Sequence, residues 1–329
     1  MPTAYVDANQ FAQIWLHAEN RKDVHERTGI TAERALNRRR RRVEHELGIT
    51  LPPHKLVGGR INQALIQAKS WPEIGNVVYD RVSDFNILIG SDRHNIPGDT
   101  PQAFKAFLHL AEEIKPHIIV INGDWFDFSA IGRFHRIGWQ NQPDISEELE
   151  DGTDKLNQVK AASPKSRRIF VPGNHDDRFD GIISNRLPQF ENVPGHALEH
   201  HLKKDWRTCS SLVINDNTII KHRYHGGIQA AYNNVLRGGQ NMVTGHTHRL
   251  MIRPWTDYGG TRYGVETGTL SDLWDETFMW KENNPSDWQP GCVVLNFSGS
   301  RMIPETCPLM VDQHHKYWGK IFYRGRWYG

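Results

Sequence analysis

The sequence contains little cysteine: Cys209, Cys292 and Cys307 are the only three among 329 residues. They are separated along the chain and form no Cys-x-x-Cys pair, which argues against a disulfide framework and a structural zinc site. This cysteine usage fits a reducing cytosol. No apolar run approaches the roughly 20 residues that span a bilayer, and the N-terminus lacks the features of a secretory signal. We therefore expect a cytoplasmic protein with no membrane partner.

An excess of charge of one sign is also absent, because the net charge is only +2. Net charge therefore gives no argument for a polyanionic partner. The distribution is uneven, however: residues 1–60 carry eleven Lys and Arg against seven Asp and Glu, and Arg38–Arg42 are consecutive. The length and the ordinary apolar content suit one large soluble domain preceded by a small one.

The first 55 residues have the pattern of a small helical domain. Apolar residues recur at helical spacing, and residues that favour helix ends separate the periodic segments. We expect helices over Asp7–Ala18, Arg21–Thr28 and Ala32–Leu47, a turn over Gly29–Thr31, and an end to the third helix at Gly48. Residues 56–82 are predicted to be a linker that contains a short helix over Ile61–Lys69.

Two short helices joined by a glycine-containing turn, the second rich in arginine, form the pattern of a helix-turn-helix. The segment resembles the small helix-turn-helix modules of phage and bacterial DNA-binding proteins. This resemblance implies DNA as a partner of residues 1–55, and the cytoplasm of a bacterial or phage-infected cell as the location. The alternative is a solvated or packing helix, since Glu33, Glu44 and Glu46 partly neutralise the arginines. In addition, five consecutive arginines cannot all face one groove.

Residues 83–329 have the alternating pattern of an α/β domain. Two apolar runs flank an amphipathic segment, which predicts a βαβ unit with parallel strands. We read the acidic stretch over residues 140–155 as a solvated helix face, and the aromatic, basic tail over residues 316–328 as the cover of a sheet edge. The predicted elements are strands over Phe85–Gly90, His117–Ile121, Arg168–Val171 and Val293–Phe297, a hairpin over Ser211–Ile220, a helix over Thr100–Lys115 and an irregular helical stretch over Ser184–Leu202.

Polar residues follow five of the predicted strand ends, which is where parallel sheets place their chemistry. Asp92 and His94 are two positions apart, so they point the same way in extended chain, and His246 and His248 repeat this spacing. Carboxylates that converge with imidazoles suit a divalent metal. The motifs in chain order are Asp92-x-His94, Gly123-Asp124-x-x-Asp127, Gly173-Asn174-His175-Asp176, His225-Gly226 and Gly245-His246-x-His248.

In this order the motifs resemble those of the calcineurin-like metallophosphoesterase superfamily over residues 85–250. The resemblance implies an α/β fold, a four-layer αββα sandwich in which two mixed sheets lie between helices over residues 83–329. It also implies two divalent metal ions and a metal-bridging hydroxide that attacks phosphorus. Manganese is the first choice on resemblance, and the oxygen and nitrogen ligands also permit iron, zinc or nickel.

The resemblance further implies a role for each motif residue. His175 would be catalytic and assist the leaving oxygen, with Asp176 or Asp127 fixing its orientation. His225 is preferred over His222 as a ligand because the superfamily histidine usually precedes glycine. The implied ligands are Asp124 as the bridge, Asp92, His94 and His248 at one metal, and Asn174, His225 and His246 at the other.

Departures from particular superfamily members narrow the substrate class. Asp127 stands where purple acid phosphatases have a redox tyrosine, and Phe128-Ser129 follows where protein phosphatases have Arg-Gly. The remaining similarity is to phosphodiesterases, Mre11-like nucleases and phage-encoded relatives. Arginines that flank the ligand loops are predicted to bind the substrate phosphate, although each is equally compatible with a surface or ion-paired role. These arginines are Arg93, Arg178 and Arg249.

We therefore expect a dimetal phosphodiesterase or nuclease that acts on DNA. One alternative is a phosphomonoesterase for a small molecule or a protein. Another is a DNA-binding protein with an idle metal site. The sequence leaves open the oligomeric state, the choice between DNA and RNA, and the choice between end and internal cleavage.

Overall fold

The computed structural model describes residues 6–18, 21–47, 51, 77–133, 142–202, 204–273 and 286–329. The chain divides into two compact units, residues 1–74 and residues 75–329, and each is described by itself. The helix predicted over Ile61–Lys69 and the helix end predicted at Gly48 lie outside the described residues. None of the described helices is both long and apolar enough to cross a membrane.

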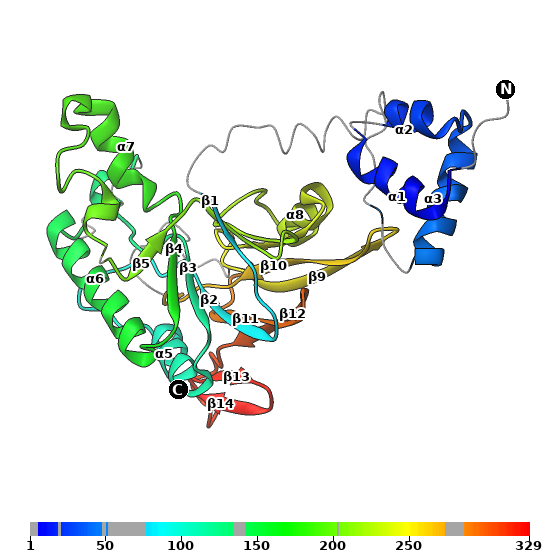
Figure 1. The fold of residues 1–329 in the computed structure, drawn as a ribbon. Helices are drawn as coiled ribbons and strands as arrows, with labels where there is room; N and C mark the ends of the chain where they lie inside the picture. Colours follow the sequence, from blue (N-terminus) through cyan, green and yellow to red (C-terminus); the bar gives the residue numbers. More distant parts are fainter. Residues whose placement is uncertain are drawn as a thin grey trace. The chain divides into compact units, whose positions relative to one another are not determined.

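The first unit is built from the three predicted helices, each within one residue of its expected bounds. They are α1 (Ala8–His17), α2 (Arg21–Thr28) and α3 (Glu33–Leu47), drawn in blue in Figure 1. Asp7 caps α1 by accepting the N–H of Gln10 at 2.8 Å, and the Gln10 side chain accepts the N–H of Asp7 in return. This capping box satisfies two N–H groups that the first turn leaves without helical partners. The side chains of Phe11, Trp15, Val24, Leu36 and Val43 are completely buried and form the core of this unit.

The second unit contains two six-stranded sheets. The central strands of the first sheet are parallel, and β11 joins them antiparallel to β2. The strands of this sheet, in spatial order, are β12 (Arg301–Pro308), β11 (Gly291–Ser298), β2 (Phe85–Gly90), β3 (Ile118–Asn122), β4 (Arg167–Val171) and β5 (Trp206–Thr208).

The second sheet includes a strand within the range that the sequence predicted as linker, β1, which pairs in parallel with β6. The predicted hairpin is confirmed as β6 and β7, and Asn215 and Asp216 form its turn with φ of 52° and 56°. Positive φ at both positions suits a tight hairpin turn and is tolerated by Asn and Asp. The strands, in spatial order, are β1 (Val77–Asp80), β6 (Ser211–Ile214), β7 (Thr218–Ile220), β8 (Asn241–Thr244), β10 (Gly260–Thr267) and β9 (Leu250–Asp257).

The predicted αββα layering is confirmed, and β3 shows why it forms. Ile118 and Val120 pack into a core between the two sheets, whereas Ile119 and Ile121 pack into a second core beneath helices. A strand that is buried on both faces needs such a continuous apolar run. On the outer face of the first sheet lie α5 (Gln102–Ile114) and α6 (Ile145–Ala162), and α8 (Ala230–Gly238) packs on β8, β9 and β10 (Figure 1).

Three local features complete the description of the second unit. The irregular helical stretch predicted over Ser184–Leu202 is the end of α7 (Asp177–Arg186) followed by single 3-10 turns. The helix itself begins earlier than predicted, directly after the Asn174-His175-Asp176 motif. Cys292 and Cys307, although distant along the chain, lie directly opposite each other on β11 and β12 as buried free thiols. The C-terminal hairpin of β13 (Ile321–Tyr323) and β14 (Arg326–Tyr328) packs against edge strand β12 and α5, as expected for the aromatic tail.

Replacing Gly264 in β10 by alanine is expected to destabilise the second unit, because the added Cβ would lie 1.9 Å from the carbonyl oxygen of Ala231 in α8. Moving α8 off the sheet costs roughly 1–3 kcal/mol. Gly181→Ala in α7 is the matched control, since its Cβ would meet no described atom within 4 Å. Urea unfolding measures both variants, and equal stability of the two would contradict this packing.

Candidate active site

The loops that carry the predicted ligands leave the carboxyl ends of strands from both sheets. β2, β3 and β4 deliver three of these loops, and β7 and β8 deliver the other two. Several ligand positions adopt the left-handed region of backbone space, which is uncommon for residues other than glycine and which gathers at functional sites. Their φ values are 53° at Asp92, 47° at His94, 48° at Asp124, 72° at His246 and 59° at His248.

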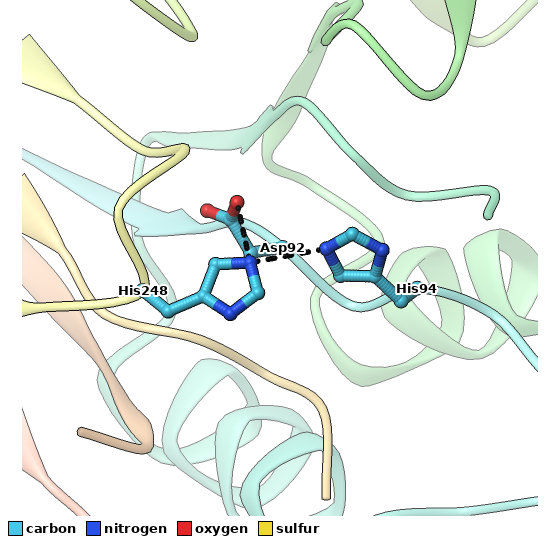
Figure 2. A group of neighbouring side chains, drawn as sticks. All are labelled: Asp92, His94 and His248. Atoms are coloured by element: carbon cyan, nitrogen blue, oxygen red, sulfur yellow. Dashed lines mark hydrogen bonds and ion pairs between the residues drawn. The ribbon is translucent and has the colours of Figure 1, made fainter. Parts of the chain in front are cut away.

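The first cluster consists of Asp92, His94 and His248, all buried (Figure 2). The Nε2 atom of His248 lies 3.3 Å from Asp92 Oδ1 and 3.1 Å from Nε2 of His94. The main-chain N–H of His246 donates to both oxygens of Asp92 at 3.0 Å, which fixes the carboxylate. Two imidazole nitrogens and one carboxylate oxygen thus converge on one point, as the ligands of a divalent cation do.

The second cluster consists of Asp124, His222 and His246. His222 donates from Nδ1 to the carbonyl oxygen of Asn122 at 2.7 Å, so its Nε2 faces Asp124 Oδ2 at 3.1 Å. A backbone carbonyl that fixes the tautomer in this way is typical of metal-binding histidines. Although burial lowers it, the neighbouring Asp124 carboxylate raises the pKa of His222 to about 9. The site therefore favours positive charge at Nε2, which a proton or a metal ion supplies.

Asn174, a predicted ligand, belongs to the loop that contacts Asp124 of the second cluster. Its side-chain Oδ1 atom is buried and accepts no hydrogen bond from any described residue. An orphaned buried acceptor is costly unless a cation or water satisfies it. Its loop approaches Asp124 so closely that a Cβ on Gly173 would lie 2.2 Å from Asp124 Oδ1, and the N–H of His175 donates to this oxygen at 2.8 Å. These residues fit a resident metal ion.

The choice of His225 over His222 needs correction. β7 ends at Ile220, so His222 lies at the sheet edge and points into the site, where it is only 3% exposed. His225 is half-buried and belongs to none of the clusters found among the described residues. Its ring instead packs against Tyr224, at 4.3 Å between centroids, and its main-chain N–H donates to Asn234. The distance of a histidine from the strand end therefore indicates which histidine enters the site better than the glycine that follows His225 does.

His175 and His94 share one carboxylate, that of Asp127. Asp127 Oδ1 lies 2.8 Å from His175 Nδ1 and 2.9 Å from His94 Nδ1. Arg178 donates from Nη2 to Nε2 of His175 at 3.0 Å, which leaves the imidazole proton on Nδ1, directed at Asp127. Although burial raises it, the hydrogen bonds from His175 and His94 hold the pKa of Asp127 well below its usual range. Asp127 therefore fixes the orientation of a predicted metal ligand and of the predicted catalytic histidine.

Asp176, predicted to be catalytic, does not share the position of Asp127 beside the His175 ring. It is fully buried, and its two oxygens accept the main-chain N–H groups of Phe126 at 2.9 Å and of Gly173 at 2.8 Å. Burial raises its pKa to about 7. Asp176 thus ties the loop after β3 to the loop after β4. Its oxygens do not contact the ring of His175 in any hydrogen bond among described residues, so Asp127 rather than Asp176 orients that ring.

The three predicted phosphate-binding arginines occupy three different environments. Arg178 reaches His175 and the carbonyl oxygen of Asp127, at 2.6 Å. Arg93 is only 1% exposed, and its guanidinium lies over the rings of Phe104 and Trp125 and donates to the carbonyl oxygen of Asp99. Arg249 donates to Asp287 at 2.6 Å and to the Gly227 carbonyl oxygen at 2.9 Å. Burial in an aromatic pocket argues against the prediction for Arg93, whereas Arg178 and Arg249 remain candidates.

Glu148 is a residue that sequence reasoning assigned to a solvated helix face, yet it is 1% exposed. One of its oxygens accepts the main-chain N–H groups of Asp127 at 2.6 Å and of Phe128 at 2.8 Å. It thereby holds the turn that presents Asp127 to the two histidines. Burial raises the pKa of Glu148 to about 8.

This raised pKa predicts that the free energy of unfolding depends on pH. A carboxyl group whose folded pKa exceeds its unfolded value stabilises the fold most when protonated, and this contribution declines as pH rises from about 4.5 to about 8. Between these pH values the free energy of unfolding of the wild type should fall by up to about 5 kcal/mol because of Glu148. Glu148→Gln keeps a side-chain acceptor without the charge, so this fall should be absent in the variant. Chemical unfolding of both proteins between pH 5 and pH 8.5 measures the difference, and parallel profiles would contradict an ionising buried Glu148.

Replacing His222 by alanine is expected to weaken metal binding at least tenfold, because the second cluster loses a nitrogen ligand. His225→Ala is the matched control and should bind metal as the wild type does. Calorimetric titration of the metal-stripped proteins with Mn²⁺ measures both. Loss of binding in the His225 variant alone would restore His225 as the ligand.

Comparisons with known proteins identify the family of this chain. Residues 85–315 match the family model described as calcineurin-like phosphoesterase. The gene 54 protein of Mycobacterium phage L5 is 25% identical over 245 residues, which cover 68% of this chain and 93% of that protein. The gene 54 protein of Mycobacterium phage D29 is 24% identical over 254 residues, which cover 69% of this chain and 97% of that protein.

Two solved structures are similar at low sequence identity. The phosphoesterase Yfce from E. coli is 14% identical with a TM-score of 0.33, and the match covers 66% of this chain and 96% of that one. A dimetal phosphatase from Danio rerio is 9% identical with a TM-score of 0.34, covering 68% and 96%. The family match itself spans most of the chain and includes every strand-end motif of the site. The chain therefore belongs to the calcineurin-like phosphoesterase family.

Proposed function

We propose that this protein is a metal-dependent phosphodiesterase that cleaves DNA. Family membership makes it a phosphoester hydrolase by class, and specificity for a diester and for DNA is the proposed part. The observation that carries the proposal is the placement of His175, whose ring packs edge-on against His94 at 4.5 Å between centroids and reaches both Asp127 and Arg178. A histidine with an orienting carboxylate and an adjacent cation is suited to proton transfer next to a phosphate.

Two divalent cations are part of the proposal, with manganese preferred and iron, zinc or nickel also compatible with the ligands. When bound, such ions supply positive charge for the phosphate and lower the pKa of a water molecule that attacks phosphorus. Residues of the two clusters would hold them, together with the orphaned oxygen of Asn174. The ligands would be Asp92, His94 and His248 for one ion, and Asp124, Asn174, His222 and His246 for the other.

The chain's own residues supply the proton transfer and the phosphate contact. Hydrolysis adds the oxygen of water to phosphorus and breaks the bond to the leaving oxygen, which must then gain a proton. Protonated at Nε2, His175 can deliver that proton while Asp127 stabilises the positive imidazole through Nδ1. Arg178 can exchange its bond to Nε2 for a bond to a phosphate oxygen.

A diester suits this site better than a monoester for a reason of charge. A phosphodiester carries one negative charge near neutral pH, whereas a monoester carries nearly two. Of the three arginines predicted to bind phosphate, Arg178 is the one that donates a hydrogen bond to His175. Beside the candidate proton donor, the one guanidinium of Arg178 matches the single charge of the diester.

The test compares wild type with His175→Ala, both loaded with manganese, on bis-p-nitrophenyl phosphate, p-nitrophenyl phosphate and linear DNA. We expect diester and DNA hydrolysis to fall by about 10²–10⁴-fold in the variant, as loss of a general acid does. Bound metal, measured by elemental analysis, should be unchanged because His175 is not a proposed ligand. His225→Ala is the matched control and should retain activity.

The other outcomes discriminate between the alternatives. Hydrolysis of the monoester alone would replace the proposal with a phosphomonoesterase. An absence of metal-dependent hydrolysis of all three substrates would favour a DNA-binding protein with an idle metal site. Full activity in His175→Ala would remove this residue from the mechanism.

A further inference from the structure

The arginines of α3 divide into two sets that face opposite directions. Arg39 and Arg40 are half-buried and contact the rest of the first unit. Arg39 donates to the carbonyl oxygen of Val6 at 2.9 Å and lies over the ring of Phe11. Arg40 donates to the carbonyl oxygen of Leu51 at 2.6 Å and lies over the ring of Trp15. These two arginines serve the packing of the unit.

The other cations of α3 form what we call the outer face. They are exposed and make no ion pair or side-chain hydrogen bond with any described residue. At 100° per residue they lie within an arc of about 100°, opposite the side of α3 that buries Leu36 and Val43. The outer face consists of Arg34, Arg38, Arg41, Arg42 and His45.

The acidic residues of α3 do not neutralise the outer face. The alternative of a solvated helix, considered in the sequence analysis, had assumed that they partly do. Glu33 pairs with Arg21 and with Nε2 of His25 at 2.9 Å. Glu44 pairs with Arg40 at 3.0 Å and also accepts the N–H of Leu51 at 2.9 Å. Only Glu46, at one margin of the face, is an exposed acid among the described residues of α3. The outer face is therefore strongly cationic.

We propose that the outer face of α3 binds the phosphate backbone of duplex DNA. The proposal adds a binding surface to the proposed DNA hydrolase, but it concerns binding alone. Unpaired arginines on one side of a helix are suited to phosphate oxygens, and the major groove of B-DNA is wide enough to admit a helix. Contacts to phosphate oxygens carry no sequence information, so we expect binding that depends little on sequence.

Other polyanions fit this surface less well. An interfacial membrane helix needs an exposed apolar side, whereas Leu36 and Val43 are buried in the core of the unit. Single-stranded nucleic acid is bound by stacking on Phe, Tyr or Trp, and α3 contains none of these residues. The major groove of duplex RNA is too deep and narrow to be read by side chains. Duplex DNA is therefore the occupant that the surface favours.

The test uses the full chain carrying His175→Ala, so that bound DNA is not cleaved, and a short fluorescent DNA duplex. Anisotropy at several salt concentrations gives the affinity and its salt dependence. Arg38→Gln with Arg41→Gln should lower the affinity at least tenfold at physiological salt and reduce the slope of log K against log salt by about two. The matched control is Arg81→Gln with Arg237→Gln, two exposed arginines of the second unit with the same change in net charge.

Loss of binding in the α3 variant but not in the control, with unchanged thermal unfolding, supports the proposal. Equal affinity and slope in the α3 variant overturn it, and so does an equal loss in the control pair. Tighter binding to vesicles of anionic phospholipid, or to single-stranded DNA, also overturns it. A variant that carries Arg38→Gln and Arg41→Gln but keeps His175 is assayed separately for hydrolysis of bis-p-nitrophenyl phosphate. Failure of the binding proposal and failure of the proposed hydrolase activity are thus distinguishable.

Discussion

The arrangement of the site depends on one carboxylate, Asp127, that two histidines share. Through His94 it orients a candidate ligand of the first cluster, and through His175 it orients the candidate proton donor. Its own turn is held by Glu148, a buried residue from α6. A side chain that is fixed by such a series of hydrogen bonds loses little freedom when the reaction begins, which is the advantage of a preorganised site. The relative placement of metal ligand and proton donor is therefore set by the fold.

Elements whose signals are local could be predicted closely from the sequence. The helices of the first unit and the strand Phe85–Gly90 match their expected bounds because caps, apolar spacing and glycine turns lie within the segment itself. The layering followed from apolar runs long enough to be buried on both faces. Strand β1 was missed because it is four residues long and is defined by its partner β6, which is more than a hundred residues away.

The site was predictable as a set of motifs but less so in its details, and the reasons are physical. His222 and His225 are both histidines that follow β7. Which of them reaches Asp124 depends on the residue at which β7 ends, and the sequence does not define that residue. Arg93 lies between two candidate ligands in the sequence, yet its guanidinium packs over the rings of Phe104 and Trp125, which come from later segments of the chain. Glu148 could not be told from its acidic neighbours, because its partners belong to a loop twenty residues earlier. Motifs identify the chemistry, and tertiary contacts assign the roles.

The left-handed backbone at Asp92, His94, Asp124, His246 and His248 links folding to the ionic composition of the surroundings. Each such residue costs on the order of 1 kcal/mol, so the five together consume a sizeable part of the 5–15 kcal/mol that stabilises a typical domain. A cation that binds only the folded arrangement returns free energy in proportion to the logarithm of its concentration above the dissociation constant. A divalent cation held by these residues would therefore raise the free energy of unfolding as its concentration rises.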